Sequence, residues 1–173
     1  NAYLILSDKI TLVDTVKTPF QDELMARISS VVDPKEISVI ISNHSEMDHS
    51  GCLPGVIDLV KPEQVYASIM GVKALARHFN IDREIIAVKD DDTISLGNMD
   101  ITFMETRMLH WPDSMACYLT GDNILFSNDA FGQHYASEYL FNDLVDQNEL
   151  FNECIKYYAN ILTPFSALVD KKD

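Results

Sequence analysis

The feature that most constrains the fold is the continuous apolar run Ile37–Ser42, because such a run predicts a strand that is buried on both faces. Apolar residues at helical spacing precede this run, and strand-like segments alternate with helical segments after it. Strands that alternate with helices predict crossover units. We therefore expect an α/β fold with helices layered on sheets, and a chain of 173 residues suits a single domain with a real core.

The N-terminal half predicts a hairpin followed by alternating helices and strands. The polar turn at 7–9 is expected to join strands at Ala2–Leu6 and Ile10–Val13. Thr18 is expected to cap the next helix, with Pro19 in its first position. That helix should bury Phe20, Leu24, Ile28 and Val31 on one face and end at Asp33-Pro34. Further elements are expected between Gly51 and Pro62 (helix), at Val65–Ser68 (strand), at Met70–Phe79 (helix) and at Ile85–Val88 (strand).

The C-terminal half changes character after the acidic run at 90–92, which we interpret as a solvated turn. Two antiparallel hairpins are expected, and both are centred on turns that contain glycine. They pair Thr93–Leu96 with Ile101–Glu105, and Cys117–Thr120 with Ile124–Ser127. A long helix is expected from about Asn142 to Leu162.

Composition excludes some partners. The formal charge of −14 repels phosphate backbones, so no nucleic acid is expected as a partner. The three cysteines, Cys52, Cys117 and Cys154, form no C-x-x-C motif or disulfide framework, which indicates a reducing, cytoplasmic compartment. We find no apolar run of 18 residues and no signal peptide, so no membrane association is expected.

The segment N-H-S-E-M-D-H-S at 43–50 follows the buried strand directly and is rich in metal ligands. Open α/β sheets bind ligands beyond the carboxyl ends of their strands. On an extended loop, alternate side chains share one side, so His44, Glu46 and Asp48 are expected to converge. His49 is expected to point in a different direction. This segment is therefore the first candidate metal site.

Two more candidate ligands follow strand-like segments further along the chain, namely His110 and Asp129. Carboxylates and imidazoles without a thiolate form a hard site, which suits iron or manganese better than structural zinc. One aspartate is able to bridge two ions about 3.5–4 Å apart, as two-metal sites require.

The ligand order H-x-[HE]-x-D-H, then His, then Asp, resembles the metallo-β-lactamase superfamily. Hydrolytic members usually have His at the position of Glu46. The Glu variant, together with L-H-W-P-D-S-M and L-F-S-N-D-A-F-G-Q-H, resembles the flavodiiron protein family, which includes rubredoxin:oxygen oxidoreductases and flavorubredoxins. The resemblance runs from N-A-Y-L-I and L-V-D-T-V-K to Y-Y-A-N-I-L-T-P-F-S, nearly the whole chain.

This resemblance implies the metallo-β-lactamase-like αβ/βα sandwich and a site for two iron ions. His44, Glu46 and His110 would bind one iron, Asp48 would bind the other, and Asp129 would bridge them. The implied activity is reduction of O2 to water or of NO to nitrous oxide, with electrons from FMN. Rubredoxin or a similar protein would be the electron donor, and two chains would form a head-to-tail homodimer.

His49 is variable in the family, where it sometimes ligates and sometimes turns away, so it ranks lower among the metal ligands. The chain departs from the family pattern at two points. The last ligand, a histidine in a Ser-His-Gly motif, is absent before Asp173. The flavodoxin domain that binds FMN is absent too. The resemblance therefore implies that 1–173 is a partial diiron domain, incomplete at its C-terminus, and that the chain alone has a damaged site.

Two other functions remain open at this point. A zinc-dependent hydrolase of the metallo-β-lactamase superfamily fits the H-x-x-x-D-H skeleton, although Glu46 opposes it. A diiron module that binds O2 without turnover fits the lack of a flavin domain.

Overall fold

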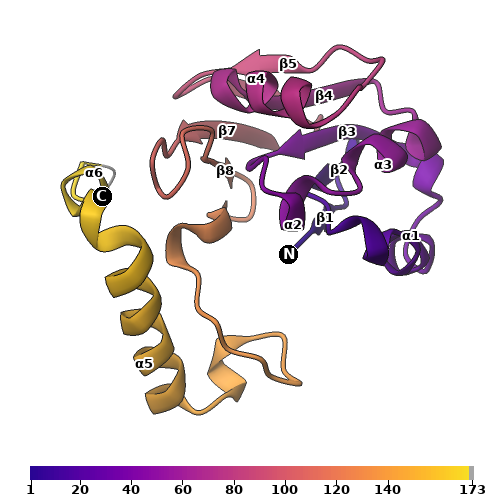
Figure 1. Cartoon of the computed structure of the whole chain (residues 1–173). Coiled ribbons are helices and arrows are strands. Elements are labelled where there is room, and N and C mark those ends of the chain that lie inside the picture. Colours follow the sequence, from indigo (N-terminus) through magenta and orange to yellow (C-terminus); the bar gives the residue numbers. More distant parts are fainter. Residues whose placement is uncertain (172–173) are drawn as a thin grey trace.

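The protein, described here by a computed structural model over residues 1–171, consists of two sheets that face each other, with helices outside them (Figure 1). The strands are β1 (Tyr3–Ile5), β2 (Ile10–Val13), β3 (Ile37–Ser42), β4 (Gln64–Ser68), β5 (Ile86–Val88), β6 (Thr93–Ser95), β7 (Asp100–Glu105), β8 (Met115–Leu119) and β9 (Ile124–Phe126). The α-helices are α1 (Gln21–Ser29), α2 (Met47–Ser50), α3 (Leu53–Val60), α4 (Ile69–His78), α5 (Gln147–Tyr157) and α6 (Ser166–Val169). The predicted α/β class is confirmed.

The first sheet has the strand order β1-β2-β3-β4-β5. The predicted N-terminal hairpin is present, because β1 pairs antiparallel with β2 and Tyr3 lies opposite Val13. All later pairings in this sheet are parallel, and each uses a helical crossover. The central strand β3 has the predicted bounds, and five of its six residues are buried. The buried apolar run therefore forms the middle of the sheet.

The second sheet is antiparallel throughout, with the order β6-β7-β8-β9. Both predicted hairpins are present, within one or two residues of the expected bounds. The pairing of Phe103 with Cys117 in β7 and β8 joins the two hairpins into one sheet.

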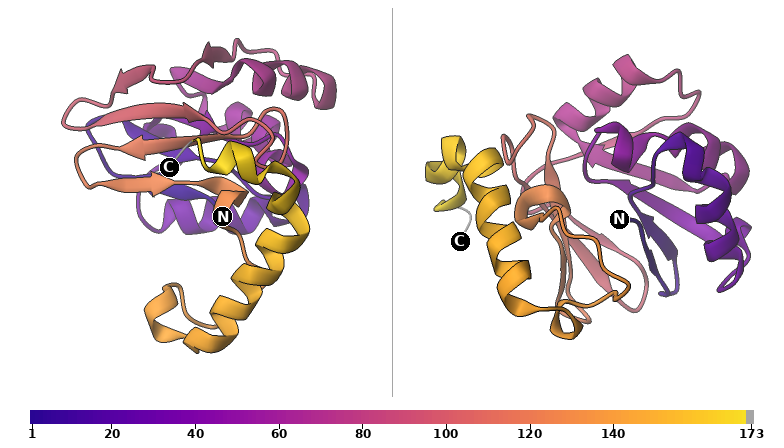
Figure 2. Two further views of the ribbon diagram at one scale, coloured as in Figure 1. Left: turned by 90° about the vertical axis from the view of Figure 1, so that its left-hand side faces the viewer. Right: turned by 60° about the horizontal axis from the view of Figure 1, so that its bottom comes forward.

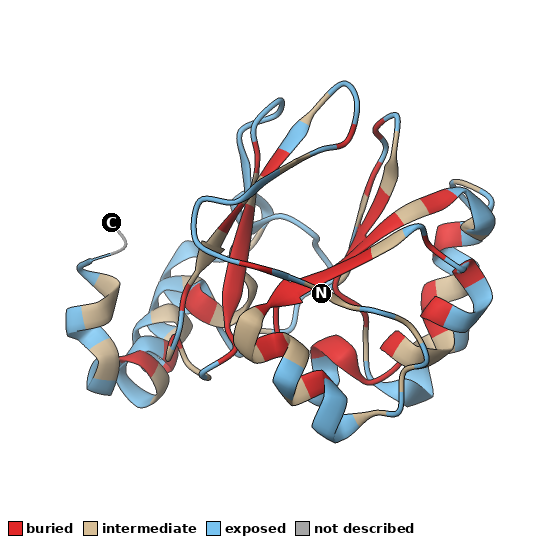
Figure 3. Cartoon of the chain, turned by 90° about the horizontal axis from the view of Figure 1, so that it is seen from above, coloured by how far each residue is buried: buried red, intermediate tan, exposed pale blue. Residues whose placement is uncertain are grey.

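Two apolar cores hold the layers of sheets and helices together (Figure 3). The core between the sheets joins Val39 and Ile41 of β3 to Phe103 and Met115 of the second sheet. The other core lies under the helices, where Ile40 packs with residues of α1, α3 and α4. Successive residues of a strand point to opposite faces, so one apolar strand supplies both cores. Burial on both faces fixes the position of the loop that follows β3.

The helix predicted to begin at Thr18 differs in its start and its buried face. A 3-10 turn occupies Thr18–Phe20, and α1 begins at Gln21. The Thr18 hydroxyl caps neither helix, because it donates a hydrogen bond to the carbonyl of Gly51 over 2.8 Å. Of the four predicted face residues only Leu24 and Ile28 are buried. Phe20 and Val31 flank the helix, outside its bounds, and are 53% and 58% exposed.

The predicted long helix is shorter than expected. It begins at Gln147, where Asp146 acts as N-cap and accepts hydrogen bonds from two backbone N–H groups. A π-helical turn, Tyr158–Leu162, continues it to the predicted end. The residues from 132 to 171 form an extended arm that lies beside the second sheet (Figure 2). No helix among residues 1–171 combines the length and apolar character needed to cross a bilayer.

Candidate metal centre

The candidate ligands lie on loops and short helical turns where the ends of the two sheets meet. Asn43, the first residue after β3, donates its backbone N–H to Asp14 Oδ1 over 2.8 Å and accepts one from the N–H of Met115 over 3.0 Å. These bonds join the loop of the first sheet to β8 of the second. His44, the next residue, is buried with 1% exposure. Its position is therefore determined by both sheets.

Four predicted ligands from three separate segments converge at this point. One ligand atom from each of His44, Glu46, His110 and Asp129 lies within 4.8 Å of the others. His44 Nε2 lies 3.3 Å from Glu46 Oε2 and 3.6 Å from Asp129 Oδ2. His110 Nε2 lies 3.4 Å from Asp129 Oδ2 and 3.7 Å from Glu46 Oε2. Two imidazoles thus alternate with two carboxylates around a common point.

The remaining two predicted ligands lie on the other side of Asp129. His49 Nε2 is 3.0 Å from Asp129 Oδ1 and 3.4 Å from Asp48 Oδ2. The two carboxylate oxygens of Asp129 therefore face two different groups. The prediction of an extended loop is wrong for Asp48 and His49, because α2 begins at Met47 and carries both residues on a helical turn. Asp48 is not among the four side chains whose ligand atoms converge.

The charges of the cluster are strongly coupled. Burial opposes ionisation of Asp129, but a hydrogen bond from His49 and the nearby rings of His49 and His44 lower its pKa to about 2. Burial also opposes a charge on the His44 ring, yet the neighbouring carboxylate of Asp113 raises its pKa. Acids and imidazoles held this close favour a cation between them, since buried charges need a partner.

The donor set fits a hard metal ion. The clustered ligand atoms are carboxylate oxygens and imidazole nitrogens, without a thiolate. Burial raises the pKa of the nearby Cys117 thiol to about 12, and Cys117 is not among the four side chains that converge. Oxygen and imidazole ligands without thiolate suit iron or manganese, as the sequence predicts.

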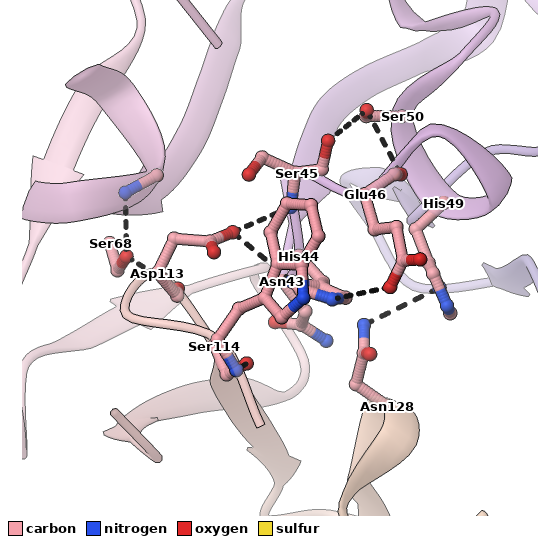
Figure 4. Close-up of polar contacts among 12 residues, drawn as sticks. Asn43, His44, Ser45, Glu46, His49, Ser50, Ser68, Asp113, Ser114 and Asn128 are labelled. Atoms are coloured by element: carbon pink, nitrogen blue, oxygen red, sulfur yellow. Dashed lines mark hydrogen bonds and ion pairs between the residues drawn. The ribbon is translucent and has the colours of Figure 1, made fainter. Parts of the chain in front are cut away.

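Sequence reasoning missed the buried residue that orients His44. The carboxylate of Asp113 lies 3.1 Å from His44 Nδ1 and accepts the backbone N–H of Ser45 over 2.6 Å (Figure 4). A carboxylate at Nδ1 keeps the proton there and leaves Nε2 free for a metal, as in other metal-binding histidines. The only local signal was its position in W-P-D-S-M, three residues after His110.

Two aromatic side chains lie near the cluster. The Trp111 ring packs edge-on against His44 with 5.2 Å between ring centroids. Tyr157 reaches the site from α5 in the arm, and its ring packs against His134 at 5.2 Å. Burial and then the acids Asp129 and Glu46 raise the pKa of Tyr157 to about 12. The arm therefore contributes a protonated phenol close to the carboxylates.

A sandwich of two sheets with helices outside, and a histidine–carboxylate cluster at one end, defines the metallo-β-lactamase-like class of metalloproteins. Within that class the chain belongs to the ODP family, because the family model described as ODP family beta lactamase matches residues 1–168. The predicted αβ/βα fold is confirmed.

The similarity of this chain to other proteins supports the same assignment. The chain is 47% identical over 174 residues to the anaerobic nitric oxide reductase flavorubredoxin of Escherichia coli, covering 99% of this chain and 36% of that protein. Rubredoxin oxygen:oxidoreductase from Desulfovibrio gigas superposes with a TM-score of 0.96 at 43% identity, covering 99% of this chain and 43% of that one. The flavodiiron protein from Giardia intestinalis superposes with a TM-score of 0.95 at 32% identity, covering 99% and 42%. The resemblance to flavodiiron proteins is confirmed, and the chain spans about two fifths of the length of these relatives.

Proposed function

We propose that this chain is the metal-binding domain of a flavodiiron oxidoreductase that reduces O2 to water, NO to nitrous oxide, or both. The observation that carries the proposal is the cluster of His44, Glu46, His110 and Asp129. It lies in a fold shared with proteins named as an oxygen oxidoreductase and a nitric oxide reductase. Glu46 matters most, because hydrolytic members of the wider superfamily usually have histidine at this position.

Two iron ions would be held by residues on either side of Asp129. His44, Glu46 and His110 are the proposed ligands of the first ion. Nε2 of each histidine lies near Asp129 Oδ2, at 3.6 and 3.4 Å, and Glu46 Oε2 lies 3.7 Å from His110 Nε2. Asp48 is the proposed ligand of the second ion. Asp129 would bridge the two, which agrees with the outward direction of its two oxygens toward different groups.

Ferrous ions at this site would supply electrons and open coordination positions for O2 or NO. The protein residues set the surroundings. Asp113 keeps the proton of His44 on Nδ1, and Trp111 packs against the His44 ring. Tyr157 keeps its phenolic proton at neutral pH, because its pKa lies near 12, and holds that proton close to Asp129 and Glu46.

The electron path and the assembly are also proposals. FMN, in a flavodoxin-like part outside these residues, would deliver electrons that come from rubredoxin or a similar donor. A head-to-tail homodimer and a cytoplasmic location stay predictions from the sequence. The domain assignment of 1–173 is likewise part of this proposal.

The first experiment measures metal content and gas consumption in the intact protein purified without oxygen. We expect two irons per chain, and consumption of O2 or NO when reduced FMN is supplied. Glu46→Ala and Asp129→Ala should lose most of the iron, because each removes a carboxylate from the cluster. His78→Ala is the control, since His78 is exposed at the end of α4.

Equal iron content in the three variants would refute the ligand assignment. Zinc in protein grown with ample iron, together with hydrolysis of an ester, thioester or β-lactam, would favour the hydrolase. Reversible O2 binding without electron consumption would favour a binding module.

A further inference from the structure

The carboxylate of Asp14 connects the two segments that carry His44 and Asp129. Asp14 follows β2 directly and is buried, with 3% exposure. Its Oδ1 accepts the backbone N–H of Asn43, the residue before His44, over 2.8 Å. Its Oδ2 accepts a hydrogen bond from Nδ2 of Asn128, the residue before Asp129, over 3.1 Å. One buried side chain thus binds the neighbour of each of two candidate ligands.

The amide of Asn128 extends this connection to the backbone of Asp129. Its Oδ1 accepts the Asp129 N–H over 2.7 Å. A backbone N–H only donates, so this contact establishes which end of the amide is oxygen, and Nδ2 is the end that donates to Asp14. Nδ2 also lies 3.5 Å from His49 Nδ1 (Figure 4). The hydrogen bonds therefore run without interruption from Asp14 to the backbone of Asp129.

The backbone on both sides of the Asp14 side chain is held by neighbouring segments. The N–H of Asp14 donates to the carbonyl of Ile41 in β3 over 2.8 Å. The next residue, Thr15, donates its backbone N–H and its Oγ1 to the carbonyl of His49, over 2.8 and 2.7 Å. Asp14 therefore presents its two oxygens from a fixed position, which a residue that supports a metal site requires.

Asp14 and Asn128 share an unusual backbone conformation. Asp14 has φ 57° and Asn128 has φ 56°, both in the left-handed region. Asp and Asn adopt this region more readily than other residues that carry a side chain. An exchange of Asp and Asn at these two positions therefore keeps the backbone conformation available and changes only the hydrogen-bonding groups.

We propose that Asp14 is a positioning residue that sets the separation of His44 and Asp129, because each of its two oxygens holds the residue before one of these ligands. The inference rests on the proposed function, since it takes His44 and Asp129 as metal ligands. Residues that support a ligand typically contribute about 10–100-fold to metal affinity. A loss in this range is expected when the connection through Asp14 is broken.

Two single substitutions break the contact between Asp14 and Asn128 with opposite changes of charge. In Asp14→Asn the new amide has one oxygen for two donors, so either the Asn43 N–H or the Asn128 amide loses its acceptor. In Asn128→Asp two carboxylates face each other and neither donates. Both variants should bind Zn²⁺ about 10–100-fold more weakly than the wild type. If negative charge near the site set the affinity instead, Asn128→Asp would bind Zn²⁺ more tightly, and this result would refute the proposal.

The double variant Asp14→Asn/Asn128→Asp restores the connection with donor and acceptor exchanged. The oxygen of the new amide at position 14 accepts the Asn43 N–H, and its N–H2 group donates to the new carboxylate at position 128. The other oxygen of that carboxylate accepts the Asp129 N–H, and the total charge equals that of the wild type. The double variant should therefore bind Zn²⁺ about tenfold or more tightly than either single variant. Independent effects would add and make the double variant the weakest of the three, which would overturn the proposal.

The measurement is competition between the intact protein and a chromophoric chelator for Zn²⁺ at neutral pH. Urea unfolding of the metal-free proteins, carried out in parallel, shows which variants are folded. The visible absorption spectrum of bound Co²⁺ is a second readout, because it reports the arrangement of the ligands and not the stability of the fold. The spectrum should change in both single variants and return to the wild-type form in the double variant. A wild-type spectrum in the single variants would contradict the positioning role.

Asn128→Gly covers the case in which the exchanged variants do not fold. Glycine adopts a positive φ without strain, so this change removes the amide and leaves the backbone conformation available. Asn123→Gly is the matched control, because Asn123 has the same φ of 56° in an exposed turn. Zn²⁺ affinity should fall about tenfold or more in Asn128→Gly and stay at the wild-type value in the control. Equal affinities would refute the role of the connection.

The test also separates this inference from the proposed function. A wild-type protein that binds Zn²⁺ but takes up no iron and consumes neither O2 nor NO would refute the proposed function, while the Zn²⁺ affinities would still decide the role of Asp14. A wild-type protein that binds no Zn²⁺ at the cluster would refute both.

Discussion

The body of the molecule, residues 1–131, and the arm, residues 132–171, differ in how far they bury their large apolar side chains. In the body, apolar residues of the strands pack into two cores, and many have no exposed surface. In the arm, the large apolar residues that stay exposed are Tyr139, Leu140, Phe141, Leu144, Phe151, Ile155 and Tyr158. Leu140 is 92% exposed and Phe151 66%. A helical apolar pattern therefore predicts burial only where another element supplies a surface to cover it.

The arm is nevertheless attached at defined points. Tyr157 and Leu162 are buried, and an added Cβ at Gly132 would lie 2.7 Å from the Tyr157 ring. Tyr157 also lies close enough to the acids of the cluster to have its pKa raised by them. The arm thus approaches the metal cluster through Tyr157, while its large exposed apolar side chains are not covered by any other part of residues 1–171.

The largest expected difference between the two regions comes from a matched pair of phenylalanines. Phe103→Ala should lower the free energy of unfolding by about 3–5 kcal/mol, because it leaves a cavity in the core between the sheets. Phe151→Ala should change it by about 0.5 kcal/mol or less, as exposed substitutions usually do. Urea unfolding of both variants measures the two effects. Similar losses would show that the arm is packed as tightly as the body.

The same contrast explains which elements could be predicted from the sequence. Strand β3 has its predicted bounds, because burial on both faces leaves an unbroken apolar run. The hairpins were predictable from their glycine turns. The prediction for the buried face of α1 was half wrong, since Phe20 and Val31 fit the helical spacing but lie beyond the ends of the helix. Local patterns do not show where a helix stops or what covers it.

Buried charge gives the second comparison, because the acids of the arm, such as Asp146 and Glu149, are exposed whereas Asp14 is not. Burial raises the pKa of Asp14 from 3.8 to about 6. The folded state therefore binds its proton more tightly than the unfolded state does. Below pH 3.8 both states are protonated, and between 3.8 and 6 only the unfolded state ionises, so stability falls as pH rises through this window.

Asp14→Asn should remove this pH dependence. In the metal-free protein, the wild type should lose about 2 kcal/mol relative to the variant between pH 4 and pH 7, since one pKa unit corresponds to about 1.4 kcal/mol and part of the full effect has already occurred at pH 4. The measurement is urea unfolding of both proteins across this range. Parallel pH profiles would show that Asp14 is ionised in the folded protein throughout.

The convergence of His44, Glu46, His110 and Asp129 was predictable from the sequence, and the residues that support them were not. The residues that converge at Asp129 belong to dense motifs, and their chemistry is visible in short segments. Asp14 lies 29 residues before Asn43 and 114 before Asn128, and both residues donate a hydrogen bond to its carboxylate. Single carboxylates at such separations carry no local pattern, and only the pairing of strands brings them together.

The smallest expected effects come from two helix caps, one in each region. Ser68 caps α4 in the body, where its Oγ accepts the Gly71 N–H over 2.9 Å and donates to the carbonyl of Asp113 over 2.8 Å. Asp146 caps α5 in the arm and is exposed. Ser68→Ala should cost about 2 kcal/mol, because it removes a buried cap and leaves a buried carbonyl without its donor. Asp146→Ala should cost about 1 kcal/mol or less.

The two cap variants should also differ in metal binding. This second measurement distinguishes an effect on the site from an effect on stability alone. Asp113 orients His44, so loss of its contact with Ser68 should weaken Zn²⁺ binding in Ser68→Ala. Asp146 has no hydrogen bond to the cluster among those of the described residues, so Asp146→Ala should bind Zn²⁺ as the wild type does. Competition with a chromophoric chelator measures both affinities. Equal affinities would mean that Asp113 keeps its position through Ser45 and His44 alone, and that the end of α4 adds stability without shaping the site.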